Sequence, residues 1–176
     1  KSVYGYGRFE NVITGMQMER MIVHGAEGSP IRPIKGRIAF IQCVGSRDEQ
    51  VGNEYCSRVC CMYASKLSQL LKRSDPSRDV YVFYTDLRAF GKGFEEFYDR
   101  VKNEGVDYRR GSVSEIYKRG DRLVVRAEDT LEGELLTLLA VELLVADRLA
   151  DALRRAQRLL VAGEVVANDQ VGRAED

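Results

Sequence analysis

A short apolar run that ends in a glycine turn occupies residues 37–45, with the sequence RIAFIQCVG. Its central residues lack the polar alternation of a half-exposed strand, which is typical of a strand buried on both faces of a parallel sheet. Apolar residues at helical spacing follow, up to Arg73, and Asn53 is a suitable N-cap for such a helix. Residues 79–85, DVYVFYT, then have the β-branched and aromatic composition of a second strand. The order predicts a β-α-β unit.

The alternation continues beyond this unit. A second helix is expected at Phe94–Asn103, and a strand is expected at residues 106–109, after Gly105. Three further strands are expected, the first two as an antiparallel hairpin, at residues 113–117, 123–127 and 138–145. The whole order predicts an α/β fold with a Rossmann-like, nucleotide-binding-type domain.

We expect three regions along the chain. Residues 1–35 are rich in glycine and proline and are predicted to be a loose lead-in segment with a short helical pattern. Residues 36–145 are predicted to be the Rossmann-like domain, and residues 146–176 a helical or disordered tail with an amphipathic helix at residues 147–161.

Composition and charge exclude several classes of protein. The 176 residues carry 27 basic and 27 acidic side chains, so the net charge does not favour nucleic acid or an anionic membrane as a partner. The longest apolar run, residues 135–146, is shorter than the roughly 20 residues that cross a bilayer. The first residues lack a methionine and a signal peptide, so we expect an internal fragment of a longer protein.

Four cysteines lie close together in the pattern C-x12-C-x3-C-C, at Cys43, Cys56, Cys60 and Cys61. On a single helix, Cys56 and Cys60 would share a face, and Cys43 would arrive from the end of the preceding strand. The four sulfurs are therefore expected to meet between strand and helix, where a helix N-terminus favours negative charge. Nearby basic residues, Arg47, Arg58 and Lys66, would lower the pKa values of the thiols.

The cysteine spacing alone leaves four interpretations open. An iron–sulfur cluster accommodates adjacent cysteine ligands more easily than a single zinc ion does, and zinc sites usually use two separated pairs. Zinc bound by the four cysteines would make the chain a structural or interaction domain. A redox-active dithiol and buried inert cysteines are the remaining interpretations. The clustering of the cysteines disfavours a secreted disulfide framework and points to a reducing compartment.

Three segments resemble the family of iron–sulfur A subunits of heterodisulfide reductase. These are residues 38–48 (IAFIQCVGSRD), 55–64 (YCSRVCCMYA) and 86–98 (DLRAFGKGFEEFY), and the similarity extends from about Tyr4 to about Val145. Members are flavoproteins with a thioredoxin-reductase-like core. The resemblance implies that Cys43, Cys56, Cys60 and Cys61 ligate a [4Fe-4S] cluster near FAD. It also implies that residues 1–35 are a lead-in segment from the flavin domain. Residues 146–176 do not resemble the family and form a divergent end.

The resemblance also carries expectations for cofactors and partners. It implies that Glu19 and Lys66 lie near the reactive edge of the flavin, where a lysine would stabilise an anionic reduced ring. The implied partners are other heterodisulfide reductase subunits and ferredoxin or hydrogenase-type electron carriers, in the cytoplasm of anaerobic cells, including methanogens. The segment alone is expected to be inactive.

Some expected features are missing or ambiguous in the sequence. There is no G-x-G-x-x-G fingerprint and no C-x2-C-x2-C run, so FAD would be bound mainly by parts of the protein outside this chain. His24 is interpreted as a loop residue and not as a ligand. Arg88 and Lys92, in a glycine-flanked loop, would contact a cofactor phosphate, a partner or solvent.

Overall fold

The computed structural model of the chain describes residues 4–24 and 36–146. Within these residues there are seven strands, three α-helices and one short 3-10 helix at Glu49–Val51. The strands are β1 (Val12–Ile13), β2 (Arg37–Ile41), β3 (Val80–Tyr84), β4 (Asp107–Arg110), β5 (Val113–Arg119), β6 (Arg122–Asp129) and β7 (Glu134–Ala146). The helices are α1 (Gly15–His24), α2 (Cys60–Ser74) and α3 (Phe94–Asn103).

All seven strands belong to one sheet, in the order β4-β3-β2-β7-β6-β5, with β1 also paired to β7. The pairs among β4, β3 and β2 are parallel, and so are the pairs that β2 and β1 make with the end of β7. The β5–β6 and β6–β7 pairs are antiparallel. The long strand β7 therefore joins a parallel half of the sheet to an antiparallel half.

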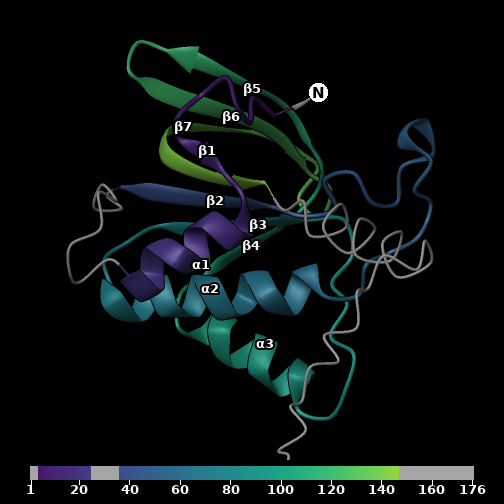
Figure 1. The fold of residues 1–176 in the computed structure, drawn as a ribbon. Helices are drawn as coiled ribbons and strands as arrows, with labels where there is room; N and C mark the ends of the chain where they lie inside the picture. The colour runs from purple at the N-terminus through teal and green to yellow at the C-terminus, as the bar shows by residue number, and fades with distance from the viewer. Residues whose placement is uncertain (1–3, 25–35, 147–176) are drawn as a thin grey trace, which may run out of the picture.

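Side chains of β2 alternate between two hydrophobic cores, as the two-residue period of a strand requires. Ile38 and Phe40 pack with residues of α1, α2 and α3 in one core. Ala39 and Ile41 pack with residues of β5 and β6 in the other core. Figure 1 shows the same arrangement, with the three helices on one side of the parallel strands and the β5–β7 strands on the other. This double burial explains why the sequence of β2 is continuously apolar.

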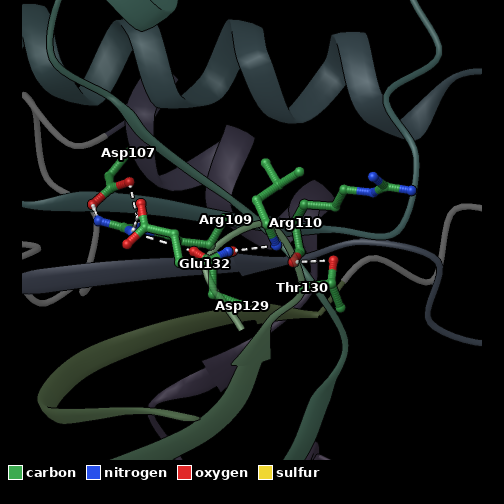
Figure 2. A network of polar contacts seen from close by, with 7 residues as sticks. Asp107, Arg109, Arg110, Asp129, Thr130 and Glu132 are labelled. Carbon is green, nitrogen blue, oxygen red and sulfur yellow. Dashed lines mark hydrogen bonds and ion pairs between the residues drawn. The ribbon is translucent and has the colours of Figure 1, made fainter. Parts of the chain in front are cut away.

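An ion-pair network joins β4 to the turn between β6 and β7 (Figure 2). The Arg109 guanidinium contacts Asp107 Oδ1 at 2.8 Å and Asp129 Oδ2 at 3.2 Å. Asp129 is buried, and its Oδ1 also accepts hydrogen bonds from the backbone N–H groups of Leu131 and Glu132. One carboxylate therefore holds the turn and neutralises the arginine at the same time.

The predicted α/β class, with a parallel sheet and an antiparallel hairpin, is confirmed. The helix at Phe94–Asn103 has the predicted bounds, and each predicted strand overlaps an observed one. The predicted C-terminal helix at residues 147–161 lies outside the described residues. None of the described helices has the length and apolar character needed to cross a membrane.

The predicted start of the first helix is wrong, because α2 begins at Cys60 and not after Asn53. Asn53 instead closes a tight loop: its backbone exchanges two hydrogen bonds with that of Asp48, and its side chain donates to the Gly45 carbonyl. Arg58 has a left-handed backbone with a φ of 62°, which a right-handed helix does not accommodate. His24 is also not in a loop, since it is the last residue of α1.

Residues 4–24 are built into the same layers as the rest. Strand β1 extends the sheet beside β7, and Met18 of α1 is fully buried in the core on the helical side. The division of the chain at residue 36 into a lead-in and a domain stays a prediction.

Candidate metal centre

The four cysteines come from three positions around the start of α2. Cys43 lies just beyond the end of β2, and Cys60 and Cys61 are the first two residues of α2. Cys56 lies in the loop before α2, so it does not share a helical face with Cys60 as the spacing predicted. Cys43 and Cys56 are partly exposed, whereas Cys60 and Cys61 are buried.

Cys60 is the centre of the sulfur contacts. Hydrogen bonds from Cys43 and Cys61, followed by one from Ser57, lower the pKa of Cys60 well below that of an ordinary thiol. The contact with Cys60, together with burial, raises the pKa values of Cys43 and Cys61. Cys56 lies within electrostatic range of Cys43, whose pKa it also raises. The strand end and the helix start are therefore brought together, as the sequence predicted.

Backbone groups surround the sulfurs as well. The backbone N–H of Arg58 donates to Cys56 Sγ at 3.3 Å, and Cys61 Sγ donates to the Asp86 carbonyl at 3.7 Å. The backbone of Arg88 also hydrogen-bonds to Cys61 and favours its thiolate. Because Asp86 and Arg88 follow β3, the site includes the loop after the neighbouring parallel strand.

The N-terminus of α2 adds to the positive potential at the site. Its N-cap residue, Val59, makes no side-chain hydrogen bond to the helix, and the first turn contains no acidic residue. The first backbone N–H groups of α2, which carry partial positive charge, are therefore not neutralised by a local carboxylate. This arrangement favours a thiolate at Cys60, whose pKa is lowered.

The four cysteines have the right chemistry for an iron–sulfur cluster, but their side chains are not placed around a common metal position. Four thiols within one loop and one helical turn are the ligand set of a [4Fe-4S] cluster. In the part of the chain that the structure describes, however, no three His, Cys, Asp or Glu side chains are placed so that they could hold a metal ion.

Of the three basic residues expected near the sulfurs, Arg47 and Arg58 lie in the cysteine loop, whereas Lys66 lies on α2. The charge of Arg47 lowers the pKa of Cys43, and Arg47 also pairs with Asp86 at 3.7 Å. Arg58 stacks on the Phe90 ring at 4.1 Å, beside the cysteine loop. Lys66 instead pairs with Glu19.

Glu19 and Lys66, the two residues expected near a flavin, contact each other. Lys66 Nζ lies 3.0 Å from Glu19 Oε1, and the Tyr63 hydroxyl donates to Glu19 Oε2 at 2.9 Å. The hydrogen bonds from Lys66 and Tyr63 lower the pKa of Glu19. Since Lys66 lies on α2 and Glu19 on α1, the pair bridges these two helices. Their position relative to a flavin stays a prediction.

Arg88 and Lys92 lie in the loop between β3 and α3. Arg88 Nε pairs with Asp86, so its charge is partly neutralised, whereas Lys92 is exposed. Asp86 was not among the predicted site residues, although it follows the carboxyl end of a predicted strand, where open α/β sheets place their ligands.

The chain is similar to curated proteins of methanogenic archaea. It is 51% identical over 150 residues to the A subunit of the H(2)/formate:CoB-CoM heterodisulfide,ferredoxin reductase of Methanococcus maripaludis, covering 78% of this chain and 22% of that protein. It is 49% identical over 147 residues to the iron-sulfur A subunit of the CoB--CoM heterodisulfide reductase of Methanocaldococcus jannaschii, with the same coverage. A third relative is the A subunit of the Ferredoxin/F(420)H(2)-dependent CoB-CoM heterodisulfide reductase of Methanosarcina acetivorans. The chain is 50% identical to it over 142 residues, which cover 77% of this chain and 18% of that protein.

The resemblance stated from the sequence is therefore confirmed. Over about three quarters of its length the chain is homologous to the A subunit of heterodisulfide reductase. It spans about a fifth of the length of these relatives. No family model matches the sequence.

Several solved structures are similar in fold. L-lysine 6-monooxygenase from Pseudomonas syringae matches with a TM-score of 0.48 at 11% identity, covering 78% of this chain and 40% of that chain. Thioredoxin reductase from T. acidophilum matches with a TM-score of 0.45 at 13% identity, covering 84% of this chain and 40% of that chain.

Proposed function

We propose that this chain is the electron-transfer segment of a heterodisulfide-reductase-like oxidoreductase, in which Cys43, Cys56, Cys60 and Cys61 bind a [4Fe-4S] cluster. Such a cluster supplies one-electron redox chemistry when it is bound. The chain itself brings Cys43 and Cys61 into contact with Cys60, and it buries Cys60 and Cys61 away from water.

One observation carries the proposal: Cys43, beyond the end of β2, hydrogen-bonds to Cys60, at the start of α2. Inert cysteines need no such convergence. The loop that achieves it also has left-handed backbones at Cys43, Arg47 and Arg58, and each costs about 1 kcal/mol in a residue other than glycine. Strained backbone of this kind clusters at functional sites, where it fixes a geometry that an unstrained loop would not adopt.

The wider function follows from the relatives. One relative is named for an iron-sulfur subunit, and others are named for ferredoxin. These names support a role in electron transfer. The family resemblance of the sequence supports FAD as the group that gives or takes the electrons, held mainly by parts of the protein outside this chain. The ion pair of Glu19 and Lys66 is assigned to the surface near the flavin. The partners are other reductase subunits and ferredoxin or hydrogenase-type carriers, in the cytoplasm.

The test is cluster reconstitution under anaerobic conditions. The purified chain is incubated with iron and sulfide, and bound iron, acid-labile sulfide and visible absorption are measured. We expect about four irons per chain and a broad absorption near 400 nm. Cys60→Ser should lose most of both, because Cys60 is the sulfur that Cys43 and Cys61 both contact.

Ser74→Ala is the matched control. It removes a hydroxyl at the other end of α2, where the Ser74 hydroxyl donates to the carbonyl of Leu71, and it should retain the wild-type iron content. A colourless wild-type protein with one tightly bound zinc would contradict the proposal and favour a zinc-stabilised interaction domain. Equal iron content in Cys60→Ser and the wild type would contradict the ligand set.

A further inference from the structure

The start of α2 carries two of the four cysteines and has little local support. Its N-cap, Val59, makes no side-chain hydrogen bond, and the preceding Arg58 has a left-handed backbone. An uncapped helix end normally frays, since its first N–H groups have no partner. Adjacent ligands at such an end need another anchor if they are to keep a fixed geometry.

A buried hydroxyl supplies a contact to this turn. Ser65 is fully buried and lies one turn after Cys61 on α2. Its hydroxyl donates to the Cys61 carbonyl at 2.9 Å. A serine hydroxyl inside a helix often bonds in this way, but the bond alone does not connect the turn to the rest of the fold.

Tyr108 makes that connection. Its hydroxyl donates to Ser65 Oγ at 2.9 Å, so a hydrogen-bond chain runs from Tyr108 through Ser65 to the backbone of Cys61. Tyr108 lies on β4 and is paired in register with Val82 of β3. The chain of hydrogen bonds therefore joins the turn that carries the cysteines to the parallel sheet.

The Tyr108 side chain is itself held in place. Its ring packs edge to face against Tyr98, with ring centroids 4.8 Å apart, and against Tyr84, with centroids 6.3 Å apart. Burial raises the pKa of Tyr108 to about 12, so its hydroxyl keeps its proton at neutral pH and remains a donor.

We propose that Tyr108 and Ser65 are positioning residues for the metal centre: they fix the turn that presents Cys60 and Cys61, and so slow the loss of a bound cluster. This rests on the proposed function. The two residues act through the Cys61 backbone and do not touch the cluster. Hydrogen-bonding partners behind metal ligands commonly change metal affinity about 10-fold or more when they are removed.

The test compares cluster loss in the reconstituted chain. Tyr108→Phe and Ser65→Ala are incubated anaerobically with excess iron chelator, and the visible absorption and circular dichroism of the cluster are followed with time. We expect each variant to lose the cluster about 10-fold faster than the wild type. The double variant should lose it no faster than either single variant, because both substitutions interrupt the same chain of hydrogen bonds.

Tyr84→Phe is the matched control. It removes a hydroxyl from the same group of packed tyrosines. The Tyr84 hydroxyl forms its hydrogen bond with Tyr98 and not with Ser65. It should lose the cluster at the wild-type rate. Far-UV circular dichroism of each cluster-free variant checks the fold, and if Tyr108→Phe does not fold, Ser65→Ala decides alone.

Three outcomes would overturn the inference, and only the last of them also overturns the proposed function. If the wild type binds a cluster but Ser65→Ala loses it as slowly as the wild type does, the inference fails and the proposed function stands. The inference also fails in this way if Tyr108→Phe folds but loses the cluster no faster than Tyr84→Phe. If the wild type binds no iron, the proposed function fails and the inference fails with it.

Discussion

Three residues other than glycine have left-handed backbones within the described residues, and all three lie in the cysteine loop. They are Cys43, Arg47 and Arg58, with φ angles of 59°, 58° and 62°. Arg58 separates Cys56 from the helix, and its backbone N–H then points to Cys56 Sγ. The strain therefore places a backbone donor at one of the proposed ligands.

The pair of Glu19 and Lys66 predicts a dependence of stability on pH. The hydrogen bonds from Lys66 and Tyr63 lower the pKa of Glu19 in the folded state relative to the unfolded state. The pair therefore stabilises the fold above the unfolded pKa, near pH 4, and this contribution is lost as the pH falls through the folded pKa. Since Lys66 is half-exposed, the contribution should be only a few tenths of a kcal/mol.

Urea unfolding at pH 7 and at pH 3 measures this contribution. Glu19→Gln should lower the unfolding midpoint at pH 7 and have a smaller effect at pH 3, because protonation of the wild-type carboxyl then weakens its ion pair with Lys66. Glu10→Gln, at an exposed position in the turn before β1, is the control for the removal of a carboxylate. An equal effect of Glu19→Gln at both pH values would show that the ion pair does not contribute.

The ligand set stays a prediction, but one contact between the predicted ligands was foreseeable from their spacing. Cysteines at the end of a strand and at the start of the next helix meet because the chain must return across the sheet, and the contact of Cys43 with Cys60 was foreseeable. The position of Cys56 was not, since no pattern in the sequence indicates that Arg58 has a left-handed backbone. The carbonyl of Asp86 was missed because backbone groups leave no signal in the residue types.

At the scale of elements, Gly111 determines how the β5–β6 hairpin joins the parallel strands. Its backbone N–H donates to the Tyr84 carbonyl at 2.8 Å, immediately after β4 ends. A side chain at this position would collide with the backbone oxygen of Glu128 on β6. The close approach of two backbones at this corner therefore requires glycine.

Gly111→Ala should destabilise the fold by about 2 kcal/mol, because the added methyl group must push one backbone away from the other. Gly120→Ala is the comparison, since Gly120 has a φ of 62° but no atom near the position of the added methyl group. It should cost about 1 kcal/mol, from the left-handed conformation alone. Urea unfolding measures both, and an equal or smaller cost at Gly111 would contradict this account of the corner.

Strands were easier to predict than the beginning of α2. The continuous apolar sequence of β2 follows from burial on both faces. Strand β5 buries only Val113 and Ile116, and its pairing with β6 is irregular between Val113 and Glu115. The start of α2 was misjudged because Asn53 has the properties of an N-cap, while its actual partners, Asp48 and Gly45, lie earlier in the chain. Tertiary contacts override a local capping preference here.

At the scale of the whole molecule, the site lies where the loops after two neighbouring parallel strands meet. Cys43 follows β2, and Asp86, which follows β3, contacts Cys61 through its carbonyl. Open α/β sheets bind their ligands at the carboxyl ends of their strands, and this chain places its four cysteines there in place of a glycine-rich phosphate loop. The fold thus determines the location, and the cysteines determine the chemistry.

The central claim is that one iron–sulfur cluster is bound by four named sulfurs. Crystals of the anaerobically reconstituted chain, measured at wavelengths on both sides of the iron absorption edge, test it most directly. We expect one compact group of iron peaks, bonded to Sγ of Cys43, Cys56, Cys60 and Cys61. A single zinc peak at these sulfurs, or iron peaks bonded to fewer than four of them, would contradict the account.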